Sequence, residues 1–340
     1  MNQHRIVSKT PLFNEKGGIK DPGYCTNNLY EYNRKDIKAN PFRIKEWDFY
    51  QFSNERYTVQ MTVADISMGS GANFAIFDRT NGNKVEAMRI SLLTLGRTGL
   101  SSKASDPNIL KISKKNFEFR ICTSKKKRCF SLDAKGSHGE KICVRLEAEI
   151  PKGLESLTMA VPFSDDYHFY LNEKINSMPV KGFVEAGDIR TEFLPDRHFC
   201  ILDWGRGVWP YKCCWYWGNG NHVTDSGDVF GFEIGWGFGD MSNASENMIF
   251  FNGKAHKIGE ITLQKEDYMK PWHFTSDDGR FNFTMIPEYD NYSSSRVLGL
   301  IGNRCHQVFG KWYGTAVLDD GTKVEINNMT AFCEFSDNRW

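Results

Sequence analysis

Alternation of apolar and polar residues with a period of two is the feature that most restricts the fold of this chain. It recurs in runs such as Tyr57–Ile66, Phe199–Arg206 and Val229–Trp236, which are rich in β-branched and aromatic residues. Asn-Gly and Asp-Gly steps separate such runs, as at Asn252-Gly253, and favour tight hairpin turns. Convincing amphipathic helix patterns are missing. The sequence therefore predicts an all-β protein, built as two β-barrels or sandwiches.

A chain of 340 residues is long for one hydrophobic core and typical of two. We expect an extended N-terminal arm over residues 1–40, a first β-barrel or sandwich over 41–178, and a second over 179–340. The boundary is placed at residues 172–183 (NEKINSMPVKGF), where Asn, Pro and Gly interrupt the strand pattern. The aromatic pocket described below belongs to the second predicted domain.

The charge of the chain is balanced, with 43 basic and 42 acidic residues and a net charge of +1. No global field therefore recruits nucleic acid or an anionic membrane. The one dense basic run, residues 125–128, favours a solvated hairpin tip over a nucleic-acid patch. No apolar run approaches the roughly 18 residues of a transmembrane helix, and the N-terminus lacks the apolar region of a secretory signal. The nine Cys show no zinc-ligand spacing, so we expect reduced thiols in a cytoplasmic protein.

Aromatic residues are concentrated between Ile201 and Asp240, which contain five of the nine Trp. A packed core does not need so many indoles, because each N–H group requires a partner. Asp203 and Arg206 lie in the same apolar stretch, where a charge is costly unless paired. Large rings beside a few ionisable groups are typical of a ligand cavity. We therefore expect an aromatic-lined pocket for an apolar or phenolic small molecule.

Asp203 is the first candidate for a catalytic acid. Strand alternation places it on the same face as Phe199 and Ile201. If that face is interior, burial favours the neutral carboxyl and makes Asp203 a candidate proton donor. The alternative is a structural Asp that binds backbone amides at the neighbouring glycines or pairs with an arginine such as Arg206.

Four further residues are candidate proton-transfer groups, each with a structural alternative. Glu233 projects alone from the glycine-rich phase of residues 229–240 and is either solvent-exposed or a cavity acid. Asp240 stands at a probable turn, where capping competes with catalysis. Glu246 opens an apolar strand and suits either ligand recognition or a buried salt bridge. His168 could shuttle a proton, although a lone His is more often structural.

The expected ligand contacts come mainly from the same aromatic stretch, and their rings form either a cavity wall or a core stripe. They are Trp204, Arg206, Trp209, Tyr211, Trp215, Trp217, Asn219, Trp236 and Asn247. Phosphate-loop, dinucleotide, nucleophile-elbow and zinc-protease motifs are missing from the sequence. We therefore expect neither a cofactor nor a metal ion.

Several blocks of the sequence resemble one family. They are FRIKEWDFYQF (42–52), VADI (63–66), LDWGRGVWPYKCCWYWGNG (202–220), GFEIGWGFGD (231–240), SENMIFFNGKAHKI (245–258) and SDDGR (276–280). The family is the uncharacterised domain of unknown function 2804, and the resemblance covers nearly the whole chain. That family is in turn similar to carotenoid hydratases, tocopherol cyclases and the lipocalin-like Diels–Alderases of fungal metabolism. The resemblance implies tandem lipocalin-like (calycin-like) β-barrels with an internal apolar pocket. It also implies cofactor-free chemistry on carbon–carbon double bonds.

Three functions follow as hypotheses. The first is a cofactor-independent hydratase, cyclase or isomerase in which Asp203, or else Asp240, Glu233 or Glu246, protonates an alkene or enol beside stabilising rings. The second is glycoside cleavage by paired carboxylates with Trp platforms. The third is a non-catalytic lipid or metabolite carrier.

Overall fold

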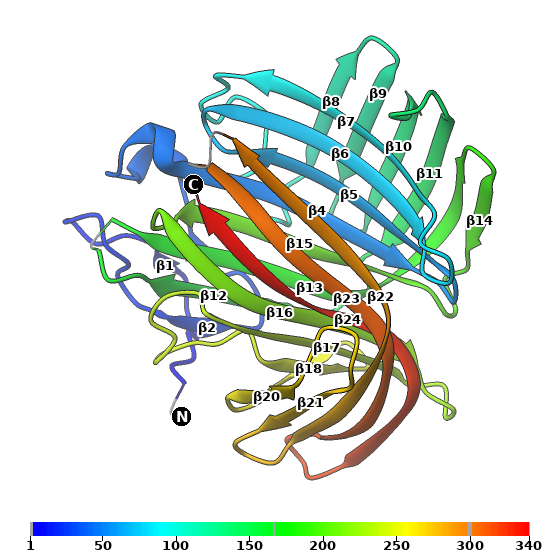
Figure 1. The fold of residues 1–340 in the computed structure, drawn as a ribbon. Helices are drawn as coiled ribbons and strands as arrows, with labels where there is room; N and C mark the ends of the chain where they lie inside the picture. Colours follow the sequence, from blue (N-terminus) through cyan, green and yellow to red (C-terminus); the bar gives the residue numbers. More distant parts are fainter. Residues whose placement is uncertain (1–2, 166, 298–300, 340) are drawn as a thin grey trace. The chain divides into compact units, whose positions relative to one another are not determined.

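The computed structural model describes residues 3–165, 167–297 and 301–339, and it is all-β, as the sequence predicts (Figure 1). These described residues contain two 3-10 helices, η1 (Arg34–Asp36) and η2 (Pro41–Arg43), and 24 strands. The strands of the first half are β1 (Thr10–Pro11), β2 (Gly23–Cys25), β3 (Tyr30–Glu31), β4 (Ile44–Ser53), β5 (Tyr57–Asp65), β6 (Gly69–Asp78), β7 (Lys84–Leu92), β8 (Asn108–Lys114), β9 (Phe117–Thr123), β10 (Lys127–Lys135), β11 (Lys141–Glu149) and β12 (Leu157–Pro162). Those that follow are β13 (Phe169–Ala186), β14 (Ile189–Phe193), β15 (Phe199–Val208), β16 (Lys212–Val223), β17 (Val229–Trp236), β18 (Met248–Phe251), β19 (Lys254–Lys257), β20 (Ile261–Lys265), β21 (Trp272–Ser276), β22 (Phe281–Val297), β23 (Ile301–Val317) and β24 (Lys323–Arg339).

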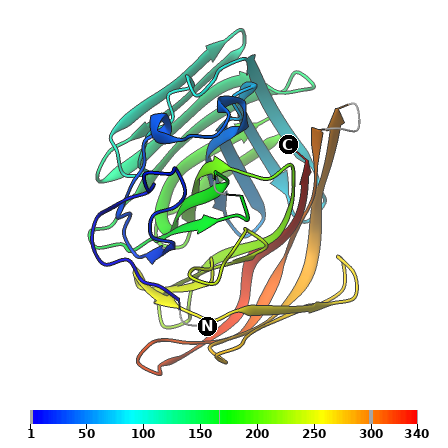
Figure 2. The ribbon, with the colours of Figure 1, turned by 90° about the vertical axis from the view of Figure 1, so that its left-hand side faces the viewer.

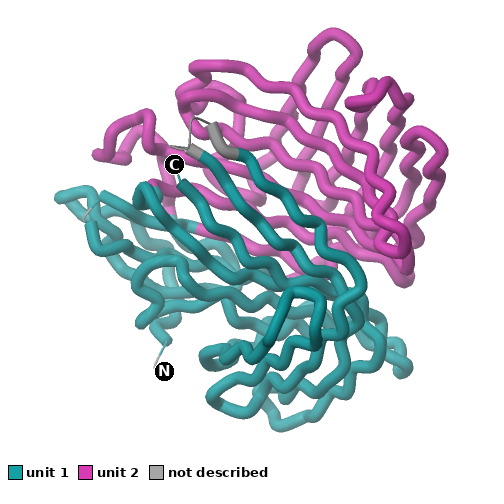
Figure 3. Tube along the Cα trace, viewed as in Figure 1, with its two compact units in different colours: residues 1–30, 155–171, 209–340 teal, residues 31–154, 172–208 magenta. Residues whose placement is uncertain are grey.

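Two compact units make up the chain, and they are interleaved in sequence (Figure 3). Unit 1 contains residues 1–30, 155–171 and 209–340, and unit 2 contains residues 31–154 and 172–208. These units differ from the consecutive domains expected from the sequence. The strand pattern is not interrupted at residues 172–183, because β13 continues through them as one strand of 18 residues, and one unit boundary falls inside this strand, between residues 171 and 172. Ser177, with φ of 56°, and Gly182, with φ of 127°, adapt the backbone locally without ending the strand.

Unit 2 is built on a curved antiparallel sheet. Its strands follow the order β7-β6-β5-β4-β15-β13-β11-β10-β9-β8, so β7 and β8 are the two ends of the path. Apolar residues of alternate positions, such as Phe52, Phe130 and Leu132, are fully or almost fully buried in its core. The predicted solvated tip at residues 125–128 is only partly correct. Arg128 is buried in β10 and donates to the Tyr50 hydroxyl and the Ala104 carbonyl.

Unit 1 contains a nine-stranded antiparallel sheet in the order β19-β18-β17-β16-β24-β23-β22-β21-β20. Figure 2 shows its long strands β22, β23 and β24 bending along their length. One face of this sheet covers a solid aromatic core that includes Phe230, Phe232, Trp272 and Trp312. The predicted Asn-Gly hairpin turn at residues 252 and 253 is present. Asn252 and Gly253 have φ of 48° and 78° and join β18 to β19.

Within the described ranges, no helix is long and apolar enough to cross a membrane. Nor do the described side chains form a group of three or more His, Cys, Asp or Glu that could hold a metal ion. The nine cysteines all lie within the described residues, and none of them forms a disulfide bond.

Candidate functional site

The second face of the unit 1 sheet, opposite its aromatic core, carries buried carboxylates. On β17 the side chains of Phe230, Phe232 and Ile234 fill the core, so the alternating glycine-rich phase with Glu233 lies on this second face. Glu233 is only 1% exposed, which excludes its solvent-exposed alternative. Trp217 of β16 donates its indole N–H to Glu233 Oε2 over 3.0 Å. We call this surface the acidic face.

A second indole–carboxylate pair lies on the same face. Trp217 is directly opposite Glu334 of β24 in the strand register, so the two share a face. Trp215, two residues before Trp217, donates its indole N–H to Glu334 Oε1 over 3.2 Å. Gln307 of β23 donates to the other oxygen of Glu334 over 3.2 Å. Burial and the neighbouring Glu334 raise the pKa of the Cys305 thiol, so that sulfur stays protonated here.

Asn219 completes the centre of the acidic face. It is 1% exposed and directly opposite Glu233 in the register of β16 and β17, which brings their Cβ atoms to about 5 Å. Its amide nitrogen has no hydrogen-bond partner among the described residues. Burying such a donor without a partner costs about 1–3 kcal/mol. A buried donor beside a buried acceptor is an arrangement that a polar ligand atom would satisfy.

Glu246 forms a second acidic centre within unit 1. It is fully buried, and Oε1 accepts a hydrogen bond from the Tyr170 hydroxyl over 3.0 Å. The Tyr170 ring lies 5.2 Å from the rings of both Trp209 and Phe238, and Phe238 stacks on Trp215 at 5.6 Å. Glu246 is thus held at one end of a continuous aromatic wall.

A glycine makes room for the Glu246 carboxylate. A Cβ atom at Gly235 would overlap Glu246 Oε2 and crowd the Phe238 ring. The neighbouring Asn247 accepts a hydrogen bond from the Gly235 N–H over 3.0 Å and donates to the Gly259 carbonyl over 2.9 Å. The glycine-rich phase of β17 therefore allows the segment that contains Glu246 and Asn247 to approach the strand closely. Asn247 positions that segment through backbone contacts.

A polar pocket of about 410 Å³ adjoins this segment and is lined by Gln3, Tyr24, Lys257, Ile258, Gly259, Asp277 and Asp278. Lys257 donates to Ser245 Oγ over 2.8 Å and to the Asn247 carbonyl over 2.5 Å. Burial lowers the pKa of Lys257 to about 7, although Asp278 and Glu246 act in the opposite direction. Lys257 therefore links the pocket to the segment that contains Glu246.

Asp203 lies in unit 2 and has two polar partners there. Asn172 donates its amide N–H to Asp203 Oδ1, and Lys174 Nζ lies 3.4 Å from the same oxygen. Both partners come from β13, and the Lys174 side chain is 1% exposed. The structural alternative predicted an arginine as the partner of Asp203. The cation beside Asp203 is instead the lysine Lys174.

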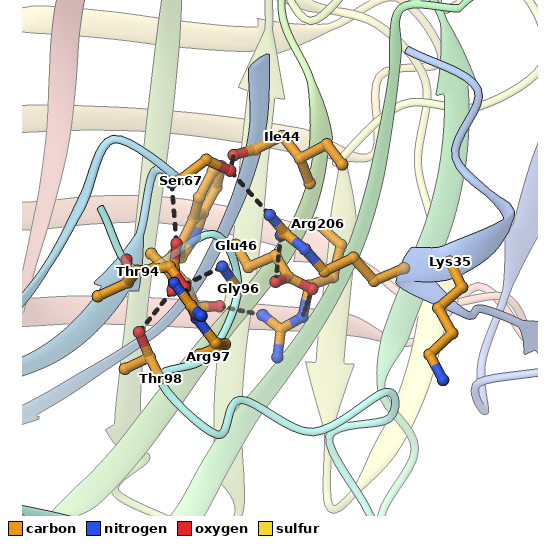
Figure 4. Close-up of polar contacts among 12 residues, drawn as sticks. Lys35, Ile44, Glu46, Ser67, Thr94, Gly96, Arg97, Thr98 and Arg206 are labelled. Atoms are coloured by element: carbon orange, nitrogen blue, oxygen red, sulfur yellow. Dashed lines mark hydrogen bonds and ion pairs between the residues drawn. The ribbon is translucent and has the colours of Figure 1, made fainter. Parts of the chain in front are cut away.

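Arg206 and Trp204 lie on the opposite face of β15 from Asp203. The Arg206 guanidinium stacks 4.0 Å from the Trp204 ring and pairs with Asp48 at 2.9 Å and with Glu46 at 3.6 Å. Figure 4 shows Glu46 beside Arg206, and Glu46 also binds Arg34 and the Tyr32 hydroxyl. Burial and the Glu46 carboxylate raise the pKa of the Tyr32 phenol well above its usual value. Arg206, Asp48 and Glu46 thus belong to a buried network of ion pairs and hydrogen bonds with a structural role.

The remaining predicted residues lie apart from the acidic face. Trp236 belongs to the core side, where it stacks on Tyr216 at 5.0 Å. Asp240 is exposed and caps a turn by accepting from the Ser242 N–H. The Ser242 side chain and then its N–H lower the pKa of Asp240. Tyr211 is 41% exposed, and His168 lies in the turn before β13, with Nδ1 3.9 Å from Asp165 Oδ1.

Sequence reasoning missed Glu334 and Gln307 as members of the acidic face. A signal was present in the last strand, where Glu334, Ser336 and Asn338 form a polar phase opposite an apolar one at Ala331 and Cys333. This polar phase is buried and hydrogen-bonded to Asn303. A run of alternating polar residues beside an apolar phase in one stretch of a long strand is the pattern that indicates such a face.

The sequence profile of one family, described as Domain of unknown function (DUF2804), matches residues 3–340. A comparison with curated proteins gives no match. Among solved structures, a putative AttH from Nitrosomonas europaea is similar, with a TM-score of 0.50 and 10% identity over 90% of this chain and 95% of that one. This likeness shows a shared fold. Kievitone hydratase from Nectria haematococca has a TM-score of 0.47 and 11% identity over 87% and 88% of the two chains. CghA with Sch210972 has a TM-score of 0.47 and 11% identity over 100% and 97%.

Proposed function

The chain belongs to the DUF2804 family, and from the geometry of its acidic face we propose that it is a cofactor-independent hydratase, cyclase or isomerase. Its substrate would be an apolar or phenolic small molecule with a carbonyl or enol oxygen conjugated to a double bond. The observation that carries this proposal is the Asn219 amide nitrogen, which has no hydrogen-bond partner among the described residues, on a residue directly opposite Glu233. Such a pair offers one donor for a substrate oxygen and one carboxylate for proton transfer.

In a hydration, Glu233 would accept a proton from water as the water oxygen bonds to the β-carbon of an enone. The π electrons would move onto the carbonyl oxygen, where the Asn219 N–H groups stabilise the developing charge. The same proton would then pass from Glu233 to the α-carbon, which restores the carboxylate. In a cyclisation, a phenol hydroxyl of the substrate would replace the water.

The aromatic residues of the acidic face would select an apolar substrate. Trp217 fixes the Glu233 carboxylate through its N–H, and its ring packs edge-on against Phe332 at 5.1 Å. Exclusion of bulk water by such rings strengthens each polar contact to the substrate. Glu246 with Tyr170 would form an adjoining acid–phenol pair for a second proton transfer. Asp203, which Lys174 and Asn172 hold, would act as a structural anchor.

A test begins with 2′-hydroxychalcone, a phenolic enone whose conjugated near-UV absorbance disappears on hydration or cyclisation. We expect Glu233→Gln to lower kcat/KM by about 10²–10⁴ and Asn219→Leu by about 10²–10³. Glu325→Gln, an exposed acid of the same sheet, is the matched control and should behave as the wild type.

Two outcomes would favour the other functions. Binding of the chalcone, detected by quenching of Trp fluorescence, without any turnover would support a carrier. Release of nitrophenol from an aryl β-glucoside by the wild type, lost in Glu233→Gln, would support glycoside cleavage. Equal chalcone turnover by the wild type and Glu233→Gln would contradict the proposed role of Glu233.

A further inference from the structure

A second, chemically different pocket lies in unit 2, separate from the acidic face. It has a volume of about 260 Å³. Its lining contains four cationic and five hydroxyl side chains and no carboxylate. The lining residues are Ser70, Ala72, Arg89, Ser91, Thr94, Arg97, Thr98, Lys111, Ile112, Ser113 and Lys114.

The pocket lies where the sheet of unit 2 does not close. Strands β7 and β8 are the ends of the strand path, and their described residues do not pair with each other. Figure 1 shows these two strands side by side, and both contribute lining residues. Edge strands carry backbone N–H and C=O groups that a neighbour or a ligand can bind. The space between β7 and β8 therefore offers a ligand backbone N–H and C=O groups in addition to the polar side chains.

The loop that forms one wall of the pocket is held rigidly by Asp65. This carboxylate is fully buried and accepts from the N–H of Ser67 at 2.8 Å, the N–H of Gly96 at 3.1 Å and the Thr98 hydroxyl at 2.5 Å. Figure 4 labels Ser67, Gly96 and Thr98, which supply these donors. Because these loop donors bind it, Asp65 does not neutralise the pocket cations by direct contact in the described structure. Thr94 Oγ1 in the same loop is buried and has no hydrogen-bond partner among the described residues.

Two arginines are oriented by backbone carbonyls instead of by acids. Arg97 donates through Nε to the Thr94 carbonyl over 3.0 Å and through Nη2 to the Leu93 carbonyl over 3.1 Å. Arg89 donates through Nη1 to the Met88 carbonyl over 2.8 Å. Neither arginine, nor Lys114, forms an ion pair with a carboxylate in the described part of the chain. Lys111 alone has such a partner, the exposed Glu118 at 3.7 Å.

We propose that this pocket binds a small phosphate-bearing anion. Arginine guanidinium groups match phosphate oxygens through paired N–H donors. The serine and threonine hydroxyls supply further donors around a tetrahedral group, more than a planar carboxylate accepts. The volume admits a phosphate with a small organic substituent, whereas a nucleic-acid strand would extend beyond it. The phosphate group could belong to free inorganic phosphate or to a phosphorylated metabolite.

Binding is tested by isothermal titration of the full chain with sodium phosphate and with glucose 6-phosphate, each at the same ionic strength set with chloride. We expect both to bind if the phosphate group is the determinant, and glucose 6-phosphate to bind more tightly if a metabolite is the natural ligand. Arg97→Gln and Lys114→Gln should each weaken binding about tenfold. Arg120→Gln, an exposed arginine of β9 outside the pocket, should have no effect.

The Lys114 ammonium makes no hydrogen bond within the described residues and Lys114 is exposed, so its variant tests binding even if Arg97→Gln disturbs the loop. Absence of phosphate binding by the wild type would overturn the proposal. So would equal losses in Arg120→Gln and Lys114→Gln, which would indicate general surface charge only. Chalcone turnover is a separate readout, and we expect the pocket variants to leave it unchanged.

Discussion

The indole nitrogen of Trp217 lies 3.0 Å from Oε2 of Glu233, across two adjacent strands of one sheet. This contact joins a ring and an acid that sequence inspection assigns to different segments. It fixes the orientation of a carboxylate that is only 1% exposed. The same geometry recurs between Trp215 and Glu334, so the indole N–H groups of β16 serve as donors to buried acids.

Removing the Trp217 N–H while keeping a ring should therefore destabilise the protein. Trp217→Phe leaves Glu233 without this donor, and we expect the free energy of unfolding to fall by about 1–3 kcal/mol. Urea unfolding followed by circular dichroism measures the change. Trp236→Phe on the core side removes an indole that is not bonded to a buried acid, so a loss of the same size there would contradict the argument.

Gly235→Ala should displace the Glu246 carboxylate. The added methyl group has no space beside Glu246 Oε2 and the Phe238 ring, and overpacking of this kind costs about 1–3 kcal/mol. Thermal unfolding measures the cost. Gly71→Ala is the matched control, because Gly71 also lies in a strand and a Cβ there would have a single described neighbour within 4 Å, the Arg89 carbonyl oxygen at 3.8 Å. Equal stability of the two variants would contradict the close approach of Glu246 to Gly235.

Asp203→Asn should unfold more easily, because it removes the carboxylate that lies 3.4 Å from the buried Lys174 ammonium. Breaking one side of a buried ion pair costs about 3 kcal/mol or more. The double variant Asp203→Asn with Lys174→Met should recover part of this loss. A double-mutant cycle in urea gives the coupling energy, which we expect to exceed about 1 kcal/mol. Additive effects would show that the two side chains do not interact.

Acid sensitivity should depend on Asp78. Burial alone would raise its pKa, but hydrogen bonds from Arg56 and Thr80 outweigh this and bring the pKa to about 2, from 3.8. The folded state thus favours the ionised carboxylate. The contribution of the ionised Asp78 to the free energy of unfolding is therefore complete above pH 3.8, and it is lost as the pH falls towards 2. Arg56→Gln should lower the free energy of unfolding at neutral pH. It should also reduce the loss of that free energy between pH 3.8 and pH 2.

Urea midpoints measured from pH 2 to 6 test this slope, with Arg190→Gln as the control. Arg190 is 81% exposed and lies 3.9 Å from Glu185, so its removal should change little. An unchanged slope in Arg56→Gln would show that the arginine does not determine the acid response.

Local patterns predicted the strands well but could not assign their faces. The predicted run Val229–Trp236 coincides with β17, and the all-β class is confirmed. Both phases of β17 lack ordinary polar residues apart from Glu233, so alternation alone could not decide which phase covers the core. In the structure Phe230, Phe232 and Ile234 lie in the core, and Trp236, in the same phase, therefore lies on the core side and away from the site.

Long-range partners were also beyond sequence reasoning. Asp203 pairs with Lys174 of β13, in a segment whose Asn, Pro and Gly content predicted a linker. Pairing of β13 with β11 and β15 overrides that local preference. The proton-transfer role of any carboxylate here stays a prediction, as do the expected ligand contacts.

The 18-residue strand β13 begins in unit 1 and ends in unit 2. Unit 1 also needs three separate stretches of the polypeptide. No single cut in the gene can therefore release either half as an intact module. Truncated expression products that end near residue 178 will lack strands of unit 2, and chimaeras made by exchanging one contiguous terminal half will mix pieces of both units.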